Sequence, residues 1–256
     1  MGAHAGLMPI VLKSKEEIAL MREAGRAVGQ ALEILKKEIK PGLVGKKLDD
    51  IVRREFARRG VTPTFLGYQG YPARVCVSVN DEVVHGIPNS RPVQEGDIVS
   101  IDLGATCKGF VGDAAITVCV GRVSPEAERL VRATEEALWE GIRAARVGVR
   151  LGEVSAAVQA HAEQNGFAVV LEYVGHGIGH EMHEEPQVPN FGRPDQGPLL
   201  QTGMALAIEP MVTAGDWRTK RDSDNWTVRT LDGSMAAHFE HTIAITDGAA
   251  EVLTLP

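Results

Sequence analysis

Four carboxylates stand in or beside apolar segments of this chain where strands are expected. Asp102 lies in IVSIDLGA and Glu209 lies in LAIEPMV, two segments whose apolar residues predict buried strands. Asp113 begins DAAITVCV and Glu240 begins EHTIAIT, which predict two further strands. An isolated buried carboxylate is costly unless it is paired, protonated or bound to a cation. The four carboxylates therefore require a compensating charge.

The source of that charge stays open between arginine and a metal cation. No arginine lies in these strand segments, so neutralisation by arginine would depend on residues remote in sequence. Between Asp102 and Asp113 stands LGATCKGFVG, a glycine-rich stretch that we expect to connect two antiparallel strands. Such a hairpin would bring both Asp side chains to one face of the sheet, where they could share a cation.

A group of histidines follows in VGHGIGHEMHEEPQVPNF, which contains His176, His180 and His183. Two glycines between His176 and His180 argue against a helical zinc site, and HEMH is one residue short of H-E-x-x-H. GHGIG departs from the dinucleotide pattern G-x-G-x-x-G, and GLVGKK at residues 42–47 misses the Walker spacing. We expect a glycine-rich turn to present His176 as a fifth ligand, and we assign no role to His180.

Four carboxylates and one imidazole form an oxygen-rich ligand set. This set suits a pair of hard or borderline divalent ions, such as Mn²⁺ or Fe²⁺, better than a thiolate-bound structural zinc. Two ions about 3.5–4 Å apart can polarise a carbonyl and lower the pKa of a shared water from 15.7 to about 7. The chemistry expected from these residues is hydrolysis.

The elements that must position these residues occur twice along the chain. Ser14 with Glu17 predicts the capped start of an amphipathic helix over residues 14–39, and a second helix is expected over 46–60. Ser124 and Pro125 predict the start of a third helix through residue 142, and residues 151–166 predict a fourth.

The repeat has a constant spacing. Gly42 and Gly148 are 106 residues apart, and so are Gly60 and Gly166. Asp102 stands six residues after Gly96, and Glu209 stands six residues after Gly203, so each half offers a carboxylate at an equivalent place. A repeat of this length predicts duplicated halves rather than a solenoid.

Bulk composition excludes several classes of protein. A net charge of −7 over 256 residues gives no electrostatic footprint for nucleic-acid readout. No window approaches the ~18 apolar residues of a membrane helix, so we expect no membrane partner. The three cysteines make no C-x-x-C pair, and the N-terminal residues lack the apolar core of a secretion signal. The expected location is the cytoplasm.

Five separated segments resemble, in order and spacing, those of the type I methionine aminopeptidases. They are FLGYQGYPARVCVSVNDEVVHGIP, SIDLGATCKGFVGDAAIT, GHGIGHEMHEEP, MALAIEPM and AHFEHTIAIT. The resemblance implies the α+β pita-bread (creatinase/aminopeptidase) fold, with two pseudo-symmetric halves and an antiparallel sheet covered by helices. It also implies a single catalytic metallopeptidase domain over residues 14–256, preceded by an N-terminal extension over residues 1–13.

The same resemblance implies roles for individual residues. The metal ligands would be Asp102, Asp113, His176, Glu209 and Glu240, with Asp113 and Glu240 bridging two ions. The ions would be Mn²⁺, Fe²⁺ or Co²⁺, with Zn²⁺ as a further candidate. Glu209 would accept the proton of the attacking water, and His85 and His183 would contact the substrate and the tetrahedral intermediate.

A pocket for the methionine side chain is also implied. Its residues would be Phe65, Tyr68, Tyr71, Cys76, His85, Met182, His183 and Trp226. Phe65 and Met182 stand where the family carries Cys and Phe, and His180 also departs from the family pattern. The pocket is therefore less firmly implied than the metal ligands.

The implied activity is removal of the N-terminal methionine from nascent proteins whose second residue is small. The partners would be nascent N-termini and, through RREFARRG at residues 53–60, a transient contact with the ribosome. We expect a monomer. Two alternatives stay open: a proline dipeptidase or aminopeptidase P, which share the fold but carry a large N-terminal domain, and a non-catalytic pita-bread domain that binds proteins or RNA.

Overall fold

The computed structural model describes residues 9–256, so residues 1–8 of the expected N-terminal extension lie outside the described residues. The helices are α1 (Lys15–Glu38), α2 (Gly45–Arg59), α3 (Pro125–Ala144) and α4 (Leu151–Gln164), with a 3₁₀ turn η1 at Tyr68–Gly70. Strands before α3 are β1 (Thr62–Pro63), β2 (Cys76–Val79), β3 (Glu82–Val84), β4 (Ile98–Cys107) and β5 (Phe110–Cys119). Strands after α4 are β6 (Ala168–Val169), β7 (Gly175–Gly177), β8 (Glu184–Val188), β9 (Ala205–Ile208), β10 (Met211–Thr213), β11 (Thr219–Arg221), β12 (Val228–Thr230), β13 (Ala236–His238), β14 (Glu240–Ala244) and β15 (Glu251–Val252).

The four expected helices are present, and their ends follow the sequence signals. Ser14 accepts a hydrogen bond from the Glu17 backbone N–H while the Glu17 side chain accepts from Ser14, which is the reciprocal capping box expected at the start of α1. Ser124 caps α3 by accepting a hydrogen bond from the Ala127 backbone N–H. Gly60 ends α2 with a φ of 67°, a conformation that costs glycine little.

One sheet carries the candidate ligands. Its strand order is β1-β4-β5-β14-β9-β7-β8, with β2 also paired to β4 and β15 to β14. Two three-stranded sheets flank it, in the orders β13-β10-β6 and β11-β12-β3. Because β5 lies beside β14, the first half of the chain joins the second along this pair of strands.

The ten-residue connection expected between Asp102 and Asp113 is wrong, although the hairpin itself is confirmed. The β4–β5 ladder continues to the Cys107–Phe110 pair, so Lys108 and Gly109 alone form the turn. The misleading glycines lie inside strands because other groups approach them closely. A Cβ on Gly104 would lie 2.9 Å from the Phe65 ring, and one on Gly112 would lie 2.7 Å from a backbone nitrogen of α1.

The duplicated halves are confirmed in the backbone hydrogen bonds. The Gly42 N–H donates to Val93, and at the equivalent place in the second half the Gly148 N–H donates to Leu200, both over 2.8 Å. Gly96 likewise donates to Val120, which directly follows β5, and Gly203 donates to Ile245, which directly follows β14, both over 2.9 Å. The two helix pairs and the antiparallel strand pair beneath each, β4–β5 and β9–β14, are therefore copies of one unit.

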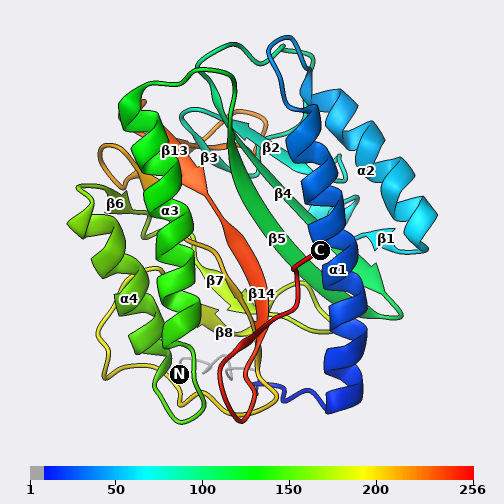
Figure 1. The fold of residues 1–256 in the computed structure, drawn as a ribbon, viewed down its shortest axis with the longest axis vertical. Coiled ribbons are helices and arrows are strands. Elements are labelled where there is room, and N and C mark those ends of the chain that lie inside the picture. The colour runs from blue at the N-terminus through cyan, green and yellow to red at the C-terminus, as the bar shows by residue number, and fades with distance from the viewer. Residues whose placement is uncertain (1–8) are drawn as a thin grey trace, which may run out of the picture.

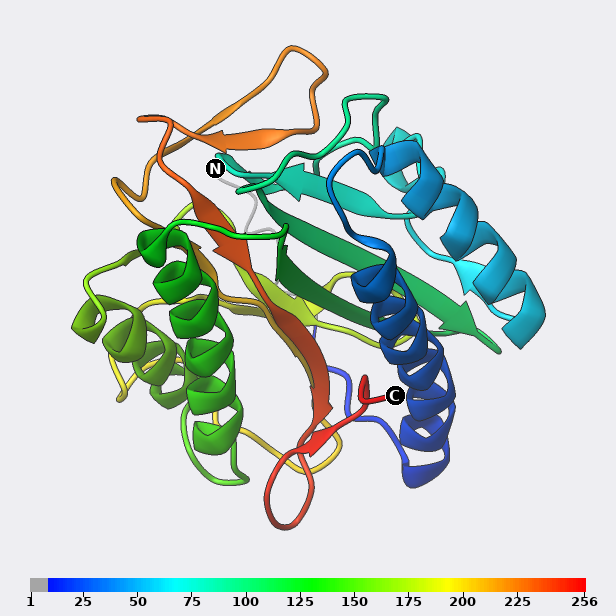
Figure 2. The same cartoon turned by 45° about the horizontal axis from the view of Figure 1, so that its top comes forward.

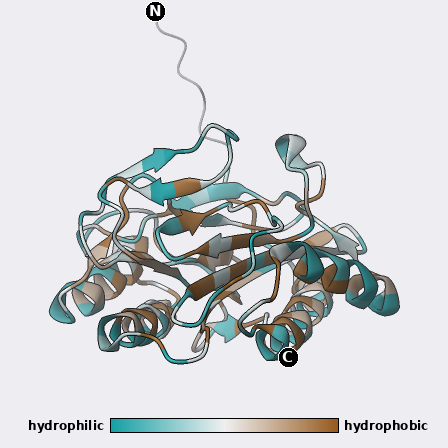
Figure 3. Ribbon diagram, turned by 90° about the horizontal axis from the view of Figure 1, so that it is seen from above, coloured by the Kyte–Doolittle hydropathy of each residue, from teal (hydrophilic) through white to brown (hydrophobic). Residues whose placement is uncertain are grey.

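All four helices cover the same side of the main sheet. Figure 1 shows α1 and α3 in front of the strands. Figure 2 shows α1 with α2 at the right of the view and α3 with α4 at the left, each pair over one half of the sheet. Each pair covers its own core: Phe56 of α2 packs with Leu103 in the first half, and Val154 of α4 packs with Leu206 in the second. Figure 3 shows the hydrophobic strands at the centre of the molecule.

In the described part of the chain, none of the four α-helices covers the opposite side of the sheet, where the candidate ligands are found. None of the helices within residues 9–256 is long and apolar enough to cross a membrane.

Candidate metal centre

The five expected ligands line a single cavity of about 640 Å³. Asp102 comes from β4, Asp113 from β5, His176 from β7 and Glu240 from the start of β14, while Glu209 directly follows β9. Their convergence follows from the hairpin register. Asp102 lies opposite Ala115 and Asp113 lies opposite Gly104, so the two Asp side chains are diagonal neighbours on one face.

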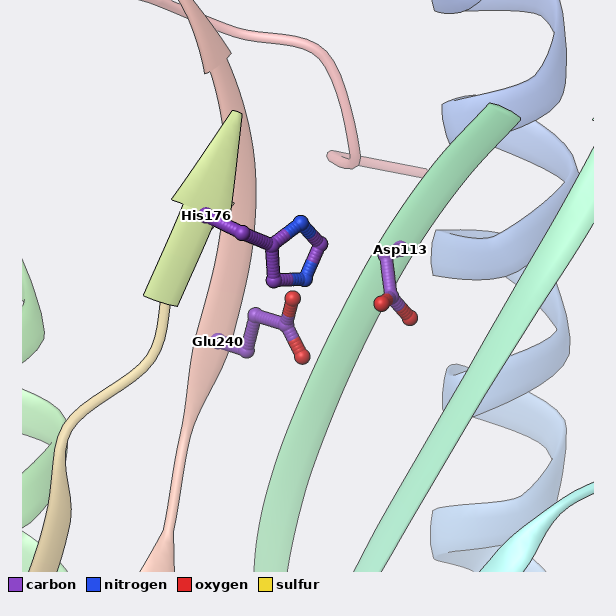
Figure 4. Close-up of side chains that lie close together, drawn as sticks. All are labelled: Asp113, His176 and Glu240. Atoms are coloured by element: carbon purple, nitrogen blue, oxygen red, sulfur yellow. The ribbon is translucent and has the colours of Figure 1, made fainter. Parts of the chain in front are cut away.

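Three of the five side chains are especially close. Asp113, His176 and Glu240 each offer one ligand atom, and these atoms all lie within 4.8 Å of one another. Figure 4 shows the three side chains pointing toward one another from three strands. Thr242 of β14 fixes the backbone of Asp113, because its hydroxyl accepts from the Asp113 N–H and donates to the Asp113 carbonyl.

His176 lies inside β7 and not in the turn where we expected it. Its neighbours Gly175 and Gly177 allow β7 to fit between two strands: a Cβ on Gly175 would lie 2.3 Å from the Ala207 carbonyl oxygen, and one on Gly177 would lie 2.2 Å from that of Glu185. The glycines therefore serve close strand packing, which a single sequence does not distinguish from a turn.

Burial makes this group of carboxylates unfavourable without a cation. Burial, followed by repulsion from neighbouring carboxylates, raises the pKa values of Asp102, Glu209 and Glu240 well above their usual range. Burial also raises the pKa of Asp113 to about 7, although hydrogen bonds with Asp102 and Glu240 oppose it. Divalent cations would offset both the desolvation and the repulsion.

Polar atoms of the site that lack hydrogen-bond partners show whether these residues suit metal ions. One oxygen each of Asp102, Asp113 and Glu240 is buried without a hydrogen-bond partner. Buried polar atoms are normally satisfied, so oxygens left free together in one cavity indicate a missing ligand. Hard divalent cations prefer oxygen donors of this kind, and the residues therefore fit such ions.

The tautomer and the charge of His176 suit a neutral imidazole that binds metal through Nε2. Its Nδ1 lies 2.9 Å from the Gly177 carbonyl, which can only accept, so Nδ1 carries the proton. Burial lowers the pKa of His176 to about 3, so the ring is neutral and the Nε2 lone pair faces Glu209 Oε1 over 3.5 Å. This arrangement is typical of imidazole ligands.

Two more histidines line the cavity beside the ligands. The His183 ring lies 4.3 Å from the His176 ring, and its Nδ1 is 2.6 Å from the hydroxyl of Tyr68. His85 has a φ of 61°, which is uncommon outside glycine and is often found where a side chain serves a site. Burial lowers the pKa of His85 to about 4, so His85 presents a neutral imidazole to the cavity.

Apolar side chains form the rest of the expected pocket. Tyr71 and Trp226 meet edge to face at 5.0 Å, and the Tyr71 hydroxyl donates to the Gly86 carbonyl. Phe65, Met182 and Cys76 are buried in the same cluster. Burial raises the pKa of the Cys76 thiol, which fits an inert wall and not a nucleophile.

His180 does not line the cavity, although it lies between His176 and His183 in the sequence. Its Nδ1 lies 2.9 Å from the Gly109 carbonyl, and its ring packs 4.0 Å from that of Phe110. It therefore contacts the β4–β5 turn.

Several residues of the site were missed from the sequence. Gln69, Arg221 and Asn225 line the cavity, and no motif marked them. His238 is buried two residues before Glu240, with Nε2 3.7 Å from Glu209 Oε2. The two-residue period of a strand could have found His238, because it places residues 238 and 240 on the same face.

The last residue of the expected N-terminal extension packs into this region. The Lys13 side chain is 2% exposed and forms an ion pair with Glu184, which directly follows His183. The Lys13 backbone N–H also donates to the carbonyl of Gly203, just before β9. Lys13 thus ties the chain entering α1 to the loop that carries His183.

The chain matches known proteins over nearly its whole length. A model of metallopeptidase family M24 matches residues 19–247. Methionine aminopeptidase 1 of Bacillus subtilis is 51% identical over 96% of this chain and 99% of that protein. The methionine aminopeptidase of Clostridium perfringens is 50% identical over the same shares of the two chains.

Solved structures agree with these sequence matches. The crystal structure of methionine aminopeptidase from Thermotoga maritima has a TM-score of 0.96 at 48% identity and covers 97% of this chain and 100% of that chain. Prolidase from Pyrococcus furiosus shares the fold, with a TM-score of 0.77 at 21% identity, and covers 96% of this chain and 66% of that chain. The expected fold of two pseudo-symmetric halves is confirmed.

Proposed function

The chain belongs to metallopeptidase family M24, and we propose that it removes the N-terminal methionine from nascent proteins whose second residue is small. The observation that carries this proposal is the convergence of five potential ligands, with three unpartnered carboxylate oxygens, in a cavity that also has apolar walls. Relatives about half identical in sequence and named methionine aminopeptidases support the choice of substrate.

The proposed ligands are Asp102, Asp113, His176, Glu209 and Glu240, with Asp113 and Glu240 bridging. Two divalent ions held there would supply Lewis acidity toward the scissile carbonyl and acidify a water molecule. Mn²⁺, Fe²⁺ and Co²⁺ are the proposed ions, and Zn²⁺ is a further candidate. The oxygen-rich donor set supports this choice because it suits hard and borderline ions.

The remaining residues of the cavity divide the work of hydrolysis. Glu209 accepts the proton of the attacking water. The neighbouring carboxylates raise its affinity for a proton, and bound cations would keep it ionised and able to accept one. His183 donates a hydrogen bond to the carbonyl oxygen, where negative charge develops. His85 also contacts the substrate. All three side chains line the same cavity, which supports these roles.

The methionine side chain occupies the apolar part of the cavity. Its walls are Phe65, Tyr68, Tyr71, Cys76, Met182 and Trp226, together with His85 and His183. The aromatic ring of Phe65 favours contact with the sulfur of a thioether, and the flexible side chain of Met182 can adapt its shape to that group. A pocket of this composition binds an unbranched apolar side chain better than a charged one.

A ribosome contact and a cytoplasmic location complete the proposal. Charge on α2 would make the contact through Arg53, Arg54, Arg58 and Arg59. Arg53 pairs with Asp50, and Arg58 and Arg59 pair with Glu55, so part of that charge is neutralised within the helix. Reversing the four arginine charges and measuring ribosome co-sedimentation tests the contact, and unchanged sedimentation would count against it. We also propose that the enzyme acts as a monomer.

A direct test uses metal-free protein reconstituted with single metals. We expect release of methionine from Met-Gly-Met and no cleavage of X-Pro dipeptides. Cleavage of X-Pro peptides alone would instead assign the chain to the prolidases, which share its fold. Metal binding without any peptidase activity would favour a non-catalytic binding domain.

A further inference from the structure

His238 is a buried histidine of β13 whose side chain has no hydrogen-bond partner. Its exposed fraction is 1%, and both of its ring nitrogens lack a partner. A neutral imidazole carries one N–H, and a buried donor left unsatisfied costs about 1–3 kcal/mol. An unpaired ring beside a proposed catalytic centre therefore requires an explanation.

The duplicated halves show what position His238 occupies. In the first half, Gly104 stands two residues after Asp102 and pairs with Asp113. In the second half, Met211 stands two residues after Glu209 and pairs with His238. His238 is therefore the counterpart of Asp113, and the fold directs both side chains to the equivalent face of their strand pairs, β4–β5 and β10–β13.

The backbone of His238 is fixed from both sides. Its N–H donates to the Thr117 hydroxyl over 2.9 Å, and its carbonyl accepts from the same hydroxyl over 2.7 Å. Ser100 in turn hydrogen-bonds the Thr117 hydroxyl. These contacts hold the backbone from which the His238 ring projects into the site.

Two carboxylates lie near the free ring nitrogen. Nε2 of His238 is 3.7 Å from Glu209 Oε2 and 4.0 Å from Glu240 Oε2. The other oxygen of Glu209, Oε1, faces His176 Nε2 over 3.5 Å. Glu209 thus lies between two imidazoles, one on each oxygen, and the His238 side requires only a small closing movement to reach hydrogen-bond length.

We propose that His238 is a positioning residue, which donates a hydrogen bond from Nε2–H to Glu209 and so fixes the orientation of that carboxylate. The proposal rests on the proposed role of Glu209 as ligand and proton acceptor. Partners that orient a metal-binding carboxylate change metal affinity or activity about 10–100-fold when they are removed.

The variants His238→Gln and His238→Leu separate a hydrogen-bonding role from simple filling of space. Glutamine retains an N–H donor, whereas leucine removes it. We expect His238→Leu to lower either the metal affinity, measured by calorimetric titration, or kcat by about 10–100-fold. The KM for Met-Gly-Met should stay unchanged. His238→Gln should recover most of the lost affinity or kcat. Equal impairment of both variants, or parental values in His238→Leu, would overturn the proposal.

His241→Leu is the matched control. His241 belongs to the adjoining strand but faces away from the cavity, and its Nδ1 hydrogen-bonds Thr254 over 2.8 Å. This variant should keep the parental metal affinity and kcat even if its Tm falls. A loss of affinity equal to that of His238→Leu would show a general effect of altering the sheet and would overturn the proposal.

A measurement on the unchanged protein does not depend on how the variants fold. In protein labelled with ¹⁵N-histidine and loaded with Zn²⁺, imidazole ¹⁵N–¹H correlations should identify His238 as protonated at Nε2. Protonation at Nδ1 alone would overturn the proposal. If this signal is found but the parent releases no methionine, the proposed function fails while the hydrogen bond stands.

Discussion

The hydroxyl oxygen of Tyr68 lies 2.6 Å from Nδ1 of His183, which joins the turn η1 to the loop before β8. Burial lowers the pKa of His183, so its ring is neutral and carries one proton. With the phenol as donor, Nδ1 accepts and Nε2 carries the proton, which is the tautomer that the proposed role of His183 requires. Tyr68 thereby leaves His183 with an N–H that can be directed at a substrate carbonyl.

Tyr68→Phe should therefore reduce turnover while the pocket stays intact. The ring remains in place, but the tautomer of His183 is no longer fixed. Loss of one hydrogen bond of about 1 kcal/mol corresponds to a fall in kcat of about five-fold. Steady-state kinetics on Met-Gly-Met would measure it, and a change confined to KM would mean that Tyr68 serves only as a pocket wall.

Asp113→Ala should lower the metal content below two ions per chain. Asp113 is proposed to bridge both ions, so its loss leaves both sites incomplete and removes a charge that limits repulsion between the ions. The number of ions per chain would be measured by elemental analysis of protein that has been dialysed against a buffer containing the metal. Asp97→Asn is a suitable control, because Asp97 lies just before β4 and bonds Asn80 and Gln94 away from the cavity. Two ions and normal turnover in Asp113→Ala would refute the bridging role.

Glu209→Gln keeps the size of the side chain but removes its charge and its ability to accept a proton. General base catalysis contributes about 10²–10⁴-fold, so kcat should fall by about that factor. The circular dichroism spectrum should match that of the parent. A two-fold loss of kcat at full metal occupancy would exclude a major catalytic role.

The three histidines of the loop should respond differently to alanine. His176→Ala should reduce metal affinity as well as rate, whereas His183→Ala should retain metal and lose about 10²–10³-fold in turnover. His180→Ala should change neither, because His180 contacts Gly109 and Phe110 outside the cavity. If His180→Ala removes the metal while His176→Ala does not, the proposed ligand set is wrong.

Much of the fold and the candidate site was predictable because the decisive signals are local. Ser14 and Gly60 marked helix ends, and Asp102 and Glu209 stood out as charges within apolar strands. Local signals failed where distant contacts decide the outcome. Gly112 lies inside a strand because α1 passes close to it, which nothing near residue 112 in the sequence indicates.

The missed residues of the site have the same explanation. Arg221 lines the cavity through the placement of β11, a short strand whose partner β12 in turn pairs with β3 from the other half of the chain. His238 could have been found by aligning the two halves strand by strand, because it is the counterpart of Asp113. The glycine spacing aligned only the ends of the helices and strands of the two halves, and not the residues within the strands.

The division of the ligand set between two copies of one unit also governs when the site can form during synthesis. Asp102 and Asp113 emerge with the first unit, but Glu240 follows Asp113 by 127 residues (240 − 113) and belongs to the second unit. A chain still under construction can fold its first helix pair over its hairpin, yet it cannot complete the ligand set until β14 has paired with β5. With the proposed ligand set, metal capture would wait until the two units have docked, and a truncated product lacking β14 would be unable to retain its ions and would remain inactive.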